Sequence, residues 1–232
     1  MTRTITSWSF SRYNKYAKCP AAAKYEILDR LPQPGSPAME RGSTIHDAAR
    51  AYIAGEVKER DPHLGRFGDL FNGLRQRHGD SVVVEDSWAF RKDWTVTTYD
   101  DWDQCWLRIK VDAATLIDNK LSILDWKTGK FSPQWNVTEY EQQLELYCLG
   151  GLLMFSAMVP DLEVSATLVY LDAGITYPDT PKVYTAKDLP RLKREWYGRT
   201  LPMLSDTLFA PNPGRGCGWC AFSSAKGGPC AH

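Results

Sequence analysis

The chain has 232 residues, 43% of them hydrophobic, which is enough for one sizeable core and short for two independent domains. Lys and Arg together number 28, as do Asp and Glu, so no global positive field attracts a polyanion and nucleic-acid binding would need local patches. No apolar run reaches the roughly 18 residues of a membrane helix and no secretory signal opens the chain, so we expect a soluble, cytoplasmic protein without membrane contact.

Charge is distributed unevenly along the chain. Residues 1–25 carry five basic side chains and no acid, whereas residues 131–181 carry seven acids and no base. Residues 182–200 are basic again. Such segregation is typical of a molecule with one face for phosphates, although solvated helix faces produce it as well.

Hydroxyl residues, prolines and glycines delimit the first predicted helices. The serines within residues 7–11 can cap a short helix that ends at Cys19, because a following proline disfavours helix in the residue before it. Residues 31–37 predict a loop rich in Pro, Gly and Ser. A helix is predicted over residues 42–53, with Ser43 as its N-cap.

The middle of the chain predicts strands, and the remainder mixes strands with helices. Alternating β-branched and aromatic residues predict strands over residues 81–90, 104–117 and 121–126, with a polar hairpin turn at 118–120. Further elements are a capping box at Thr138–Glu141 that opens a helix to Phe155, strands at 164–171 and around 182–185, and a helix at 189–208. The predicted fold is α/β, with a mixed central sheet and helices on both faces.

Two carboxylates and an ammonium are predicted to converge on this sheet. Asp112 ends one predicted strand, and Asp125-Trp126-Lys127 ends its hairpin partner. Alternation puts Asp125 and Lys127 on the same strand face. Carboxylate oxygens hold Mg²⁺ or Mn²⁺, which polarises a phosphate and acidifies water, and the Trp126 carbonyl is a further candidate ligand. Taken alone, the pattern also fits turn carboxylates and a solvated lysine.

Several motifs in order resemble the RecB-like PD-(D/E)XK nucleases, over essentially the whole chain. They are an opening helix from Ser9 to Cys19-Pro20, Gly42-x-x-x-His46, Asp112 with Asp125-x-Lys127, and Gln143-x-x-x-Tyr147. The resemblance implies that Asp112, Asp125 and His46, in the first turn of its predicted helix, are metal ligands. It implies that Lys127 orients or activates water, and that Gln143 and Tyr147 face the site from one helix face.

Some of these residues also have structural interpretations. His46 fits a capped helix residue, and Tyr147 lies on the apolar stripe of its helix. Glu85 resembles an acidic metal-binding position of many relatives, but it also fits a strand end.

The cysteines form a second constellation. Cys217, Cys220 and Cys230 lie in a C-x2-C-x9-C tail, and Cys19 is the natural fourth ligand. Four thiolates suit a [4Fe–4S] cluster or zinc, and the layout resembles the iron–sulfur RecB-like nucleases, which implies the cluster. Residues 1–30 and 209–232 would then form a cluster-binding end region, clamped over a catalytic core at 42–187, within a single nuclease domain, 1–232. Two further cysteines, Cys105 and Cys148, fit the core.

The resemblance implies a Mg²⁺- or Mn²⁺-dependent exonuclease that acts on single-stranded or end-accessible DNA in recombination, repair or phage DNA metabolism. A phage-encoded or CRISPR-adaptation-type enzyme fits the compact chain. No Gly-x-x-x-x-Gly-Lys-Ser/Thr motif occurs, so a helicase or recombination partner would supply any unwinding. The alternatives are a non-enzymatic DNA-binding module and a zinc-stapled structural subunit of a larger nuclease complex. Aromatic residues beside the early basic ones fit base stacking or core: Trp8, Phe10, Tyr13 and Tyr16.

Overall fold

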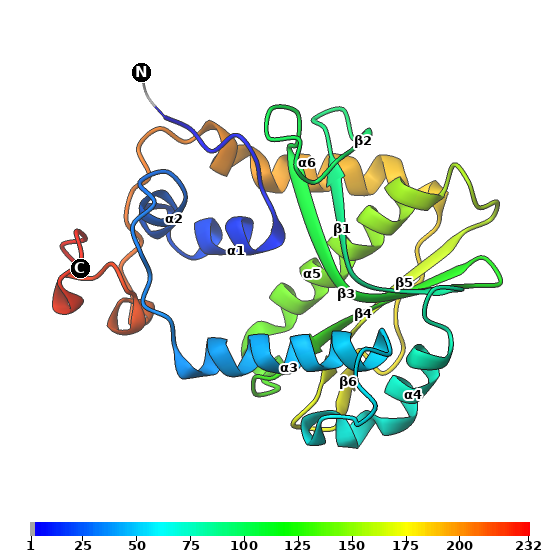
Figure 1. Ribbon diagram of the computed structural model, residues 1–232. Helices are drawn as coiled ribbons and strands as arrows, with labels where there is room; N and C mark the ends of the chain where they lie inside the picture. Colours follow the sequence, from blue (N-terminus) through cyan, green and yellow to red (C-terminus); the bar gives the residue numbers. More distant parts are fainter. Residues whose placement is uncertain (1–2) are drawn as a thin grey trace.

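A six-stranded mixed sheet forms the centre of the protein (Figure 1). The computed structural model describes residues 3–232, apart from the side chain of Trp135. The strand order is β2-β1-β3-β4-β5-β6, in which only β4 and β5 pair in parallel. The strands are β1 (Val82–Phe90), β2 (Val96–Thr97), β3 (Leu107–Ile117), β4 (Lys120–Lys127), β5 (Glu163–Tyr170) and β6 (Ile175–Tyr177).

The four longer strands lie close to their predicted positions, because alternating apolar residues bury one side of each strand. The predicted strand around residues 182–185 is wrong, since only Tyr184 forms a bridge, with Val164. Strands β2 and β6 were not predicted, because segments of two and three residues carry no usable periodicity.

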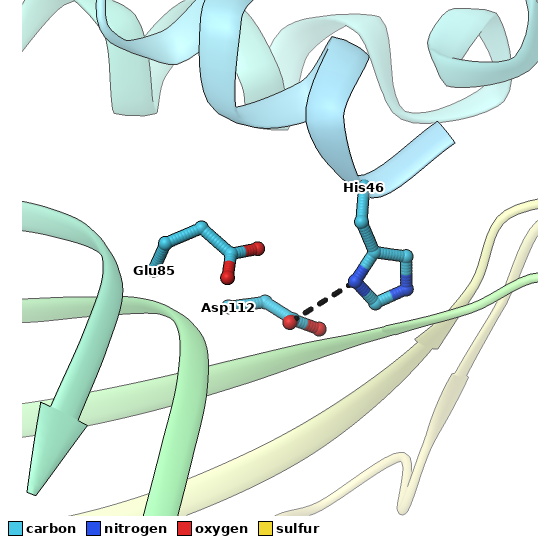
Figure 2. Close-up of side chains that lie close together, drawn as sticks. All are labelled: His46, Glu85 and Asp112. Carbon is cyan, nitrogen blue, oxygen red and sulfur yellow. Dashed lines mark hydrogen bonds and ion pairs between the residues drawn. The ribbon is translucent and has the colours of Figure 1, made fainter. Parts of the chain in front are cut away.

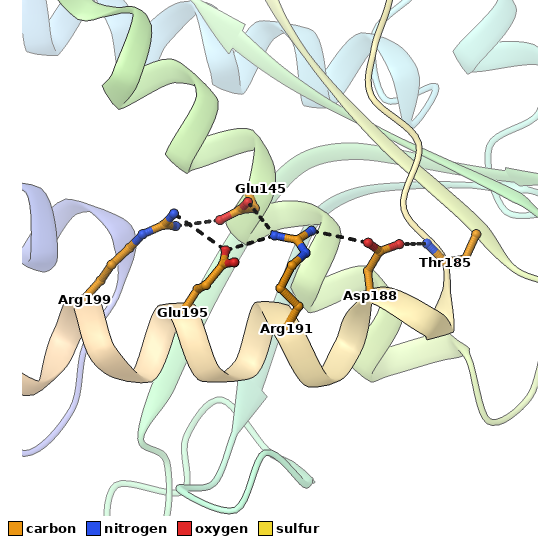
Figure 3. A network of polar contacts seen from close by, with 6 residues as sticks. All are labelled: Glu145, Thr185, Asp188, Arg191, Glu195 and Arg199. Atoms are coloured by element: carbon orange, nitrogen blue, oxygen red, sulfur yellow. Dashed lines mark hydrogen bonds and ion pairs between the residues drawn. The ribbon is translucent and has the colours of Figure 1, made fainter.

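Two long helices, α5 (Pro133–Phe155) and α6 (Leu189–Ser205), cover one face of the sheet. Their apolar side chains and those of the sheet form the α5-side core, which includes Trp88, Ile109, Leu149 and Trp196. Helix α5 approaches the sheet so closely that a Cβ at Gly150 would lie 2.6 Å from Ile109 Cδ1. Charged residues of α5, of α6 and of the turn that precedes α6 form one ion-pair network (Figure 3): Glu145, Asp188, Arg191, Glu195 and Arg199.

Helices α3 (Pro37–Ile53) and α4 (Gly68–Gln76) cover the other face of the sheet. A 3-10 turn at Pro62–Phe67 directly precedes α4. The α3-side core includes Ile45, Ala49, Phe71 and Trp126. The helix predicted over residues 42–53 begins earlier than expected. Its N-cap is Ser36, which accepts a hydrogen bond from Met39 N, so the prediction of Ser43 is wrong and His46 lies well inside the helix.

Proline also shifts the start of α5. The helix begins at Pro133, five residues before the predicted capping box, because proline suits the first turn of a helix. Thr138 therefore lies inside α5. At the other end of the chain, α6 ends at Ser205 and not at 208 as predicted.

The N-terminal segment forms two short helices, α1 (Phe10–Lys18) and α2 (Pro20–Ile27), with Cys19 between them. Ser9 caps α1 as predicted, whereas α2 was not predicted. The aromatic side chains of this segment belong to the core: Trp8 is 1% exposed and stacks on Trp196, and Phe10, Tyr13 and Tyr16 pack against the same core. Of the two interpretations of these aromatic residues, base stacking or core packing, the structure therefore favours core packing.

The tail after α6 contains two 3-10 turns, Arg215–Trp219 and Ser224–Lys226, and lies beside α1 and α2 (Figure 1). Within residues 3–232, no helix combines the length and the apolar character needed to span a lipid bilayer.

Candidate metal centre

The ladder between β1 and β3 is interrupted where Glu85 and Asp112 face each other. Val84 pairs with Ala113 and Asp86 with Val111, but the residues between them do not pair. Glu85 has a φ of +50°, which is the left-handed region. Before it, Val82 and Val84 pack on the α3-side core, whereas after it Trp88 and Phe90 pack on the α5-side core. The register of the two strands is the same on both sides of this interruption, so neither strand carries an extra residue, and the side chains of β1 reverse their faces at Glu85.

Asp112 also occupies a gap between β3 and β4. The pairing of these strands ends at Ala113 and Leu124, and beyond it the Asp112 carboxylate replaces the missing main-chain partner by accepting a hydrogen bond from Trp126 N at 2.6 Å. The prediction that Asp112 ends its strand is wrong, because β3 continues to Ile117. The side chain is fixed at the point where the strands diverge.

His46, Glu85 and Asp112, here called the His46 cluster, come from α3, β1 and β3 and point toward one another (Figure 2). One ligand atom of each lies within 4.8 Å of the others, and His46 Nδ1 is 3.1 Å from Asp112 Oδ1. Carboxylate oxygens with one imidazole nitrogen suit Mg²⁺ or Mn²⁺. The residues present therefore fit a divalent cation.

The electrostatics of the His46 cluster also favour a cation. Burial, and then the charge of Asp125, raise the pKa of Asp112. Burial and the charge of Asp112 likewise raise the pKa of Glu85. Burial lowers the pKa of His46, but the hydrogen bond and the charge of Asp112 outweigh it and raise the value overall. Each carboxylate makes it less favourable for its neighbour to be charged, and a bound dication would offset this repulsion.

A second group adjoins this cluster and is called the Asp125 network: Asp125, Lys127, Gln143 and Tyr147. Asp125 is 6% exposed, and its Oδ1 accepts hydrogen bonds from Tyr147 Oη at 2.5 Å and Gln143 Nε2 at 3.3 Å. Lys127 Nζ lies 2.6 Å from Oδ2 as an ion pair, although the two groups are not aligned as a hydrogen bond. Buried Oδ2 thus keeps a lone pair for another ligand.

Lys127 is charged in this setting. Burial lowers the pKa of its ammonium, but the charge and contact of Asp125 outweigh burial and raise the pKa above its ordinary value. An ammonium that holds its proton orients water or stabilises negative charge, and it does not act as a general base. Burial, and then the charge of Asp125, raise the pKa of Tyr147, so its hydroxyl remains a donor.

All members of both groups were predicted from the sequence, and the structure places the two groups side by side and not in one set of ligands. The ligand atoms that meet within 4.8 Å belong to the His46 cluster, and Asp125 stands beside that set. Glu85 lies inside it. Asp112 joins the groups, since it bonds to Trp126 N and its pKa responds to Asp125. The Trp126 indole packs on Phe71, and its carbonyl stays a predicted ligand.

Arg41 was not predicted from the sequence. It links α3 to the residues that follow β4 and β5, next to the site. Its guanidinium forms a bidentate ion pair with Asp172, at 2.8 Å and 3.0 Å, and donates to the Thr128 carbonyl at 3.3 Å. The only sequence signal was its place next to Gly42, where a Cβ would lie 3.3 Å from Thr128 Oγ1. Small size at that position lets α3 approach the end of β4.

The four cysteines at the two ends of the chain line one cavity of about 850 Å³. Cys19 Sγ accepts a hydrogen bond from Asn212 N, and Cys217 Sγ accepts one from Gly214 N, each at 3.4 Å. All four thiols are free and partly exposed. Cys105 and Cys148 are 4% and 1% exposed, so their prediction as core residues is confirmed.

The chain was compared with known families, proteins and structures. A family model described as the PD-(D/E)XK nuclease superfamily matches residues 7–225. The crystal structure of SSO0001 shares 15% identity with a TM-score of 0.40, and the match covers 97% of this chain and 87% of that one. A protein described as a candidate exonuclease, from Eubacterium rectale, shares 10% identity with a TM-score of 0.49, over 95% and 87% of the two chains. No curated protein matches significantly.

Proposed function

The chain belongs to the PD-(D/E)XK nuclease superfamily, and on that premise we propose that it hydrolyses DNA phosphodiesters with Mg²⁺ or Mn²⁺. The observation that carries the proposal is the convergence of His46, Glu85 and Asp112 beside the buried Asp125–Lys127 pair. Hydrolysis of a phosphodiester needs a cation to neutralise developing charge and a positive group beside the water that attacks. The two groups supply both.

The residues divide this work between them. Glu85, Asp112 and His46 would hold the cation, with Asp125 Oδ2 and the Trp126 carbonyl as further candidate ligands. When bound, such a cation polarises the phosphate and acidifies water. The Lys127 ammonium lies next to Asp125 and can position water or stabilise the charged phosphate. Tyr147 and Gln143 fix the Asp125 carboxylate through Oδ1, which leaves Oδ2 directed toward Lys127.

The substrate and setting are part of the same proposal. Exonucleolytic cleavage of single-stranded or end-accessible DNA fits a compact chain in which sequence analysis found no motor motif, and a helicase or recombination partner would provide the ends. Recombination, repair and phage DNA metabolism all require such an activity.

A [4Fe–4S] cluster on Cys19, Cys217, Cys220 and Cys230 is the second part of the proposal. A tetrahedral zinc would hold its four sulfurs about 3.8 Å apart, given Zn–S bonds near 2.3 Å. Yet among residues 3–232 no three cysteine thiols lie within 4.8 Å of one another. An iron–sulfur cluster spreads its thiolates over separate irons and suits the roomier cavity. Residues 1–30 and 209–232 would form this end region beside the catalytic core at 42–187.

Cleavage of end-labelled DNA tests the enzymatic proposal. We expect single- or double-stranded oligonucleotides to be shortened from an end when Mg²⁺ or Mn²⁺ is present, and to stay intact in chelator. Asp112→Asn should abolish cleavage. Asp118→Asn is the matched control, because Asp118 lies in the exposed turn after β3 with a φ of 49°, which asparagine adopts readily. DNA binding without metal-dependent cleavage would replace the enzyme with a non-enzymatic binding module.

A further inference from the structure

The basic residues of the N-terminal segment are not equivalent. Four of them form ion pairs: Arg3 and Lys24 with Asp29, Lys15 with Glu26, and Lys18 with Glu139. The fifth, Arg12, has no carboxylate partner within the part of the chain that the structure describes. Its Nη1 donates to the carbonyl and the hydroxyl of Ser7, at 3.1 Å and 2.9 Å. Arg12 is therefore a partly buried cation without a counter-charge.

A second arginine with the same property lies beside it. Arg108, on β3, donates from Nε to the Tyr99 carbonyl at 3.2 Å, and its Nη2 is buried without a hydrogen-bond partner among residues 3–232. Its guanidinium lies between two rings, 5.5 Å from the Tyr99 centroid and 4.3 Å from that of Trp102. Burial, and then the charge of Arg108, lower the pKa of Arg12, so the two guanidinium groups feel each other's charge.

Two neighbouring, partly buried cations lose hydration and repel each other, so the arrangement costs free energy unless an anion compensates. Elsewhere in this protein the anion is a carboxylate. Arg191 and Arg199, for example, share Glu145 and Glu195 (Figure 3). Neither Arg12 nor Arg108 forms an ion pair with a carboxylate in residues 3–232, although Asp101 lies in the same neighbourhood, which points to an anion from outside the chain. Guanidinium groups present paired donors that match a phosphate.

Trp102 adds a surface for a base. Its side chain is 73% exposed although one ring face covers Arg108. An exposed indole next to unpaired cations is the combination that binds single-stranded nucleic acid, because every base can stack on an aromatic ring while the cations bind its phosphates. The aromatic residues at the N-terminus instead pack on the α5-side core, Trp8 within it and the others against it.

The position of these residues relates them to the metal centre. Arg108, Lys110 and Asp112 alternate with Leu107, Ile109 and Val111, which pack into the α5-side core. They therefore share the opposite face of β3. Arg108 and Asp112 are four positions apart on the strand, which is about 13 Å at 3.3 Å per residue. Exposed Lys110 lies between them, close enough to Glu85 to influence its pKa.

We propose that Arg12, Arg108 and Trp102 form a binding site for a phosphate of single-stranded DNA and for the base next to it, on the strand face that leads to the metal centre. The inference rests on the proposed function and deepens it, since it names the residues that hold the substrate a few nucleotides from the cation. The phosphate is either internal or a free 5′-phosphate at the end of the strand.

Binding measured in chelator tests the site without cleavage. The probe is a 3′-labelled oligothymidylate, and fluorescence anisotropy is recorded over a series of salt concentrations. Arg108→Gln should weaken binding and reduce the slope of log affinity against log salt by about 0.7, the value for one phosphate contact on a single strand. Arg194→Gln is the control, because Arg194 is exposed on α6, which covers the opposite face of the sheet. Unchanged affinity and slope in Arg108→Gln would overturn the proposal.

Trp102 provides a second variant that does not threaten the fold. Trp102→Ala should weaken binding about 5- to 100-fold without altering the salt slope, and Trp102→Phe should retain most of the affinity. Equal binding by Trp102→Ala and the wild-type protein would contradict the base platform. Thermal melting of each variant shows that it is folded.

The 5′ end of the probe distinguishes the two sources of phosphate. Tighter binding of a 5′-phosphorylated probe that is lost in Arg108→Gln identifies a terminal phosphate, and equal binding of phosphorylated and hydroxylated probes with the same loss identifies an internal one. Wild-type protein that binds DNA but does not cleave it with Mn²⁺ contradicts the proposed function alone. Wild-type protein that does not bind DNA contradicts the site as well.

Discussion

Glu85 and Asp112 face each other across β1 and β3 at the single interruption of the ladder between these strands. A regular ladder would have kept both side chains in alternation with their neighbours. The unpaired Glu85 instead lies with His46 and Asp112, and it has a φ of +50° that glutamate seldom adopts. Such strain at a cluster of possible metal ligands is what a functional site retains.

The stability of the protein should respond to metal in a pH-dependent manner. In the absence of metal, the raised pKa values of Glu85, Asp112 and His46 mean that the folded state holds these protons more tightly than the unfolded state. Their contribution to stability is present below the ordinary values, about 4 for the carboxyls and 6.5 for histidine, and is lost as pH rises through the raised values. Metal binds the deprotonated ligands, so Mn²⁺ should raise the melting temperature more at pH 8 than at pH 5.

Thermal melting in Mn²⁺ and in chelator at the two pH values measures this difference. Asp112→Asn should remove most of the effect of Mn²⁺. An equal rise in melting temperature at both pH values would show that the metal binds elsewhere.

Lys127→Met should leave a folded protein with about 10²- to 10³-fold lower turnover, the usual cost of removing one electrostatic contact to a transition state. Asp125 keeps its hydrogen bonds from Tyr147 and Gln143, so the buried carboxylate does not lose all its partners. The matched control is Lys120→Met at the exposed start of β4, and steady-state cleavage rates compare the two. Turnover within a factor of two of wild type in Lys127→Met would exclude the proposed role.

Tyr147→Phe should destabilise the protein by about 1–3 kcal/mol, because it removes the short hydrogen bond to a buried carboxylate. Chemical denaturation gives the free energy of unfolding. If Tyr147 serves only as a core residue, the variant will unfold at the same denaturant concentration as the wild type, since phenylalanine preserves the apolar contacts.

The two glycines Gly150 and Gly73 should respond to alanine in opposite directions. At Gly150 a Cβ would lie 2.6 Å from Ile109 Cδ1 and 3.0 Å from Trp88 Cε3, both in the buried core, so overpacking of about 1–3 kcal/mol exceeds any gain in helix propensity. Gly73 lies in α4, where nothing is within 4 Å of the added atom. Gly73→Ala should therefore stabilise the protein by about 0.5–1 kcal/mol. Urea denaturation of the pair tests how closely α5 packs on the sheet.

Anaerobically purified protein should be brown and hold about four irons per chain. Replacing Cys19, Cys217, Cys220 or Cys230 by Ala should remove the colour and lower the melting temperature, whereas Cys105→Ala and Cys148→Ala should keep the colour. Iron and zinc analysis with absorbance spectra provides the measurement. Colourless protein with one zinc would establish a zinc staple, and an intact cluster in Cys19→Ala would refute the clamp between the chain ends.

Sequence reasoning recovered the parts of the site that depend on local spacing. Asp125 and Lys127 share a face because strands alternate, and Gln143 and Tyr147 share one because they are four residues apart in a helix. The start of α3 was missed because Ser36-Pro37 and Ser43 are both acceptable starts, and the Ser36 cap followed by Pro37 begins the longer helix, whose first turns bury no residue. The interruption of the ladder at Glu85 and the proximity of Arg12 to Arg108 depend on contacts across the fold, and no local pattern encodes them.

The order of these elements along the chain has a consequence for biosynthesis. Every residue of the His46 cluster and of the Asp125 network lies between His46 and Tyr147, and β5, which completes the pairing of β4, ends at Tyr170. A ribosome therefore makes all of β1 to β5 before it makes Cys217. If the proposed cluster forms, Cys19 leaves the ribosome early and waits for the three cysteines of the tail. Maturation would then depend on a reducing environment that protects the Cys19 thiol.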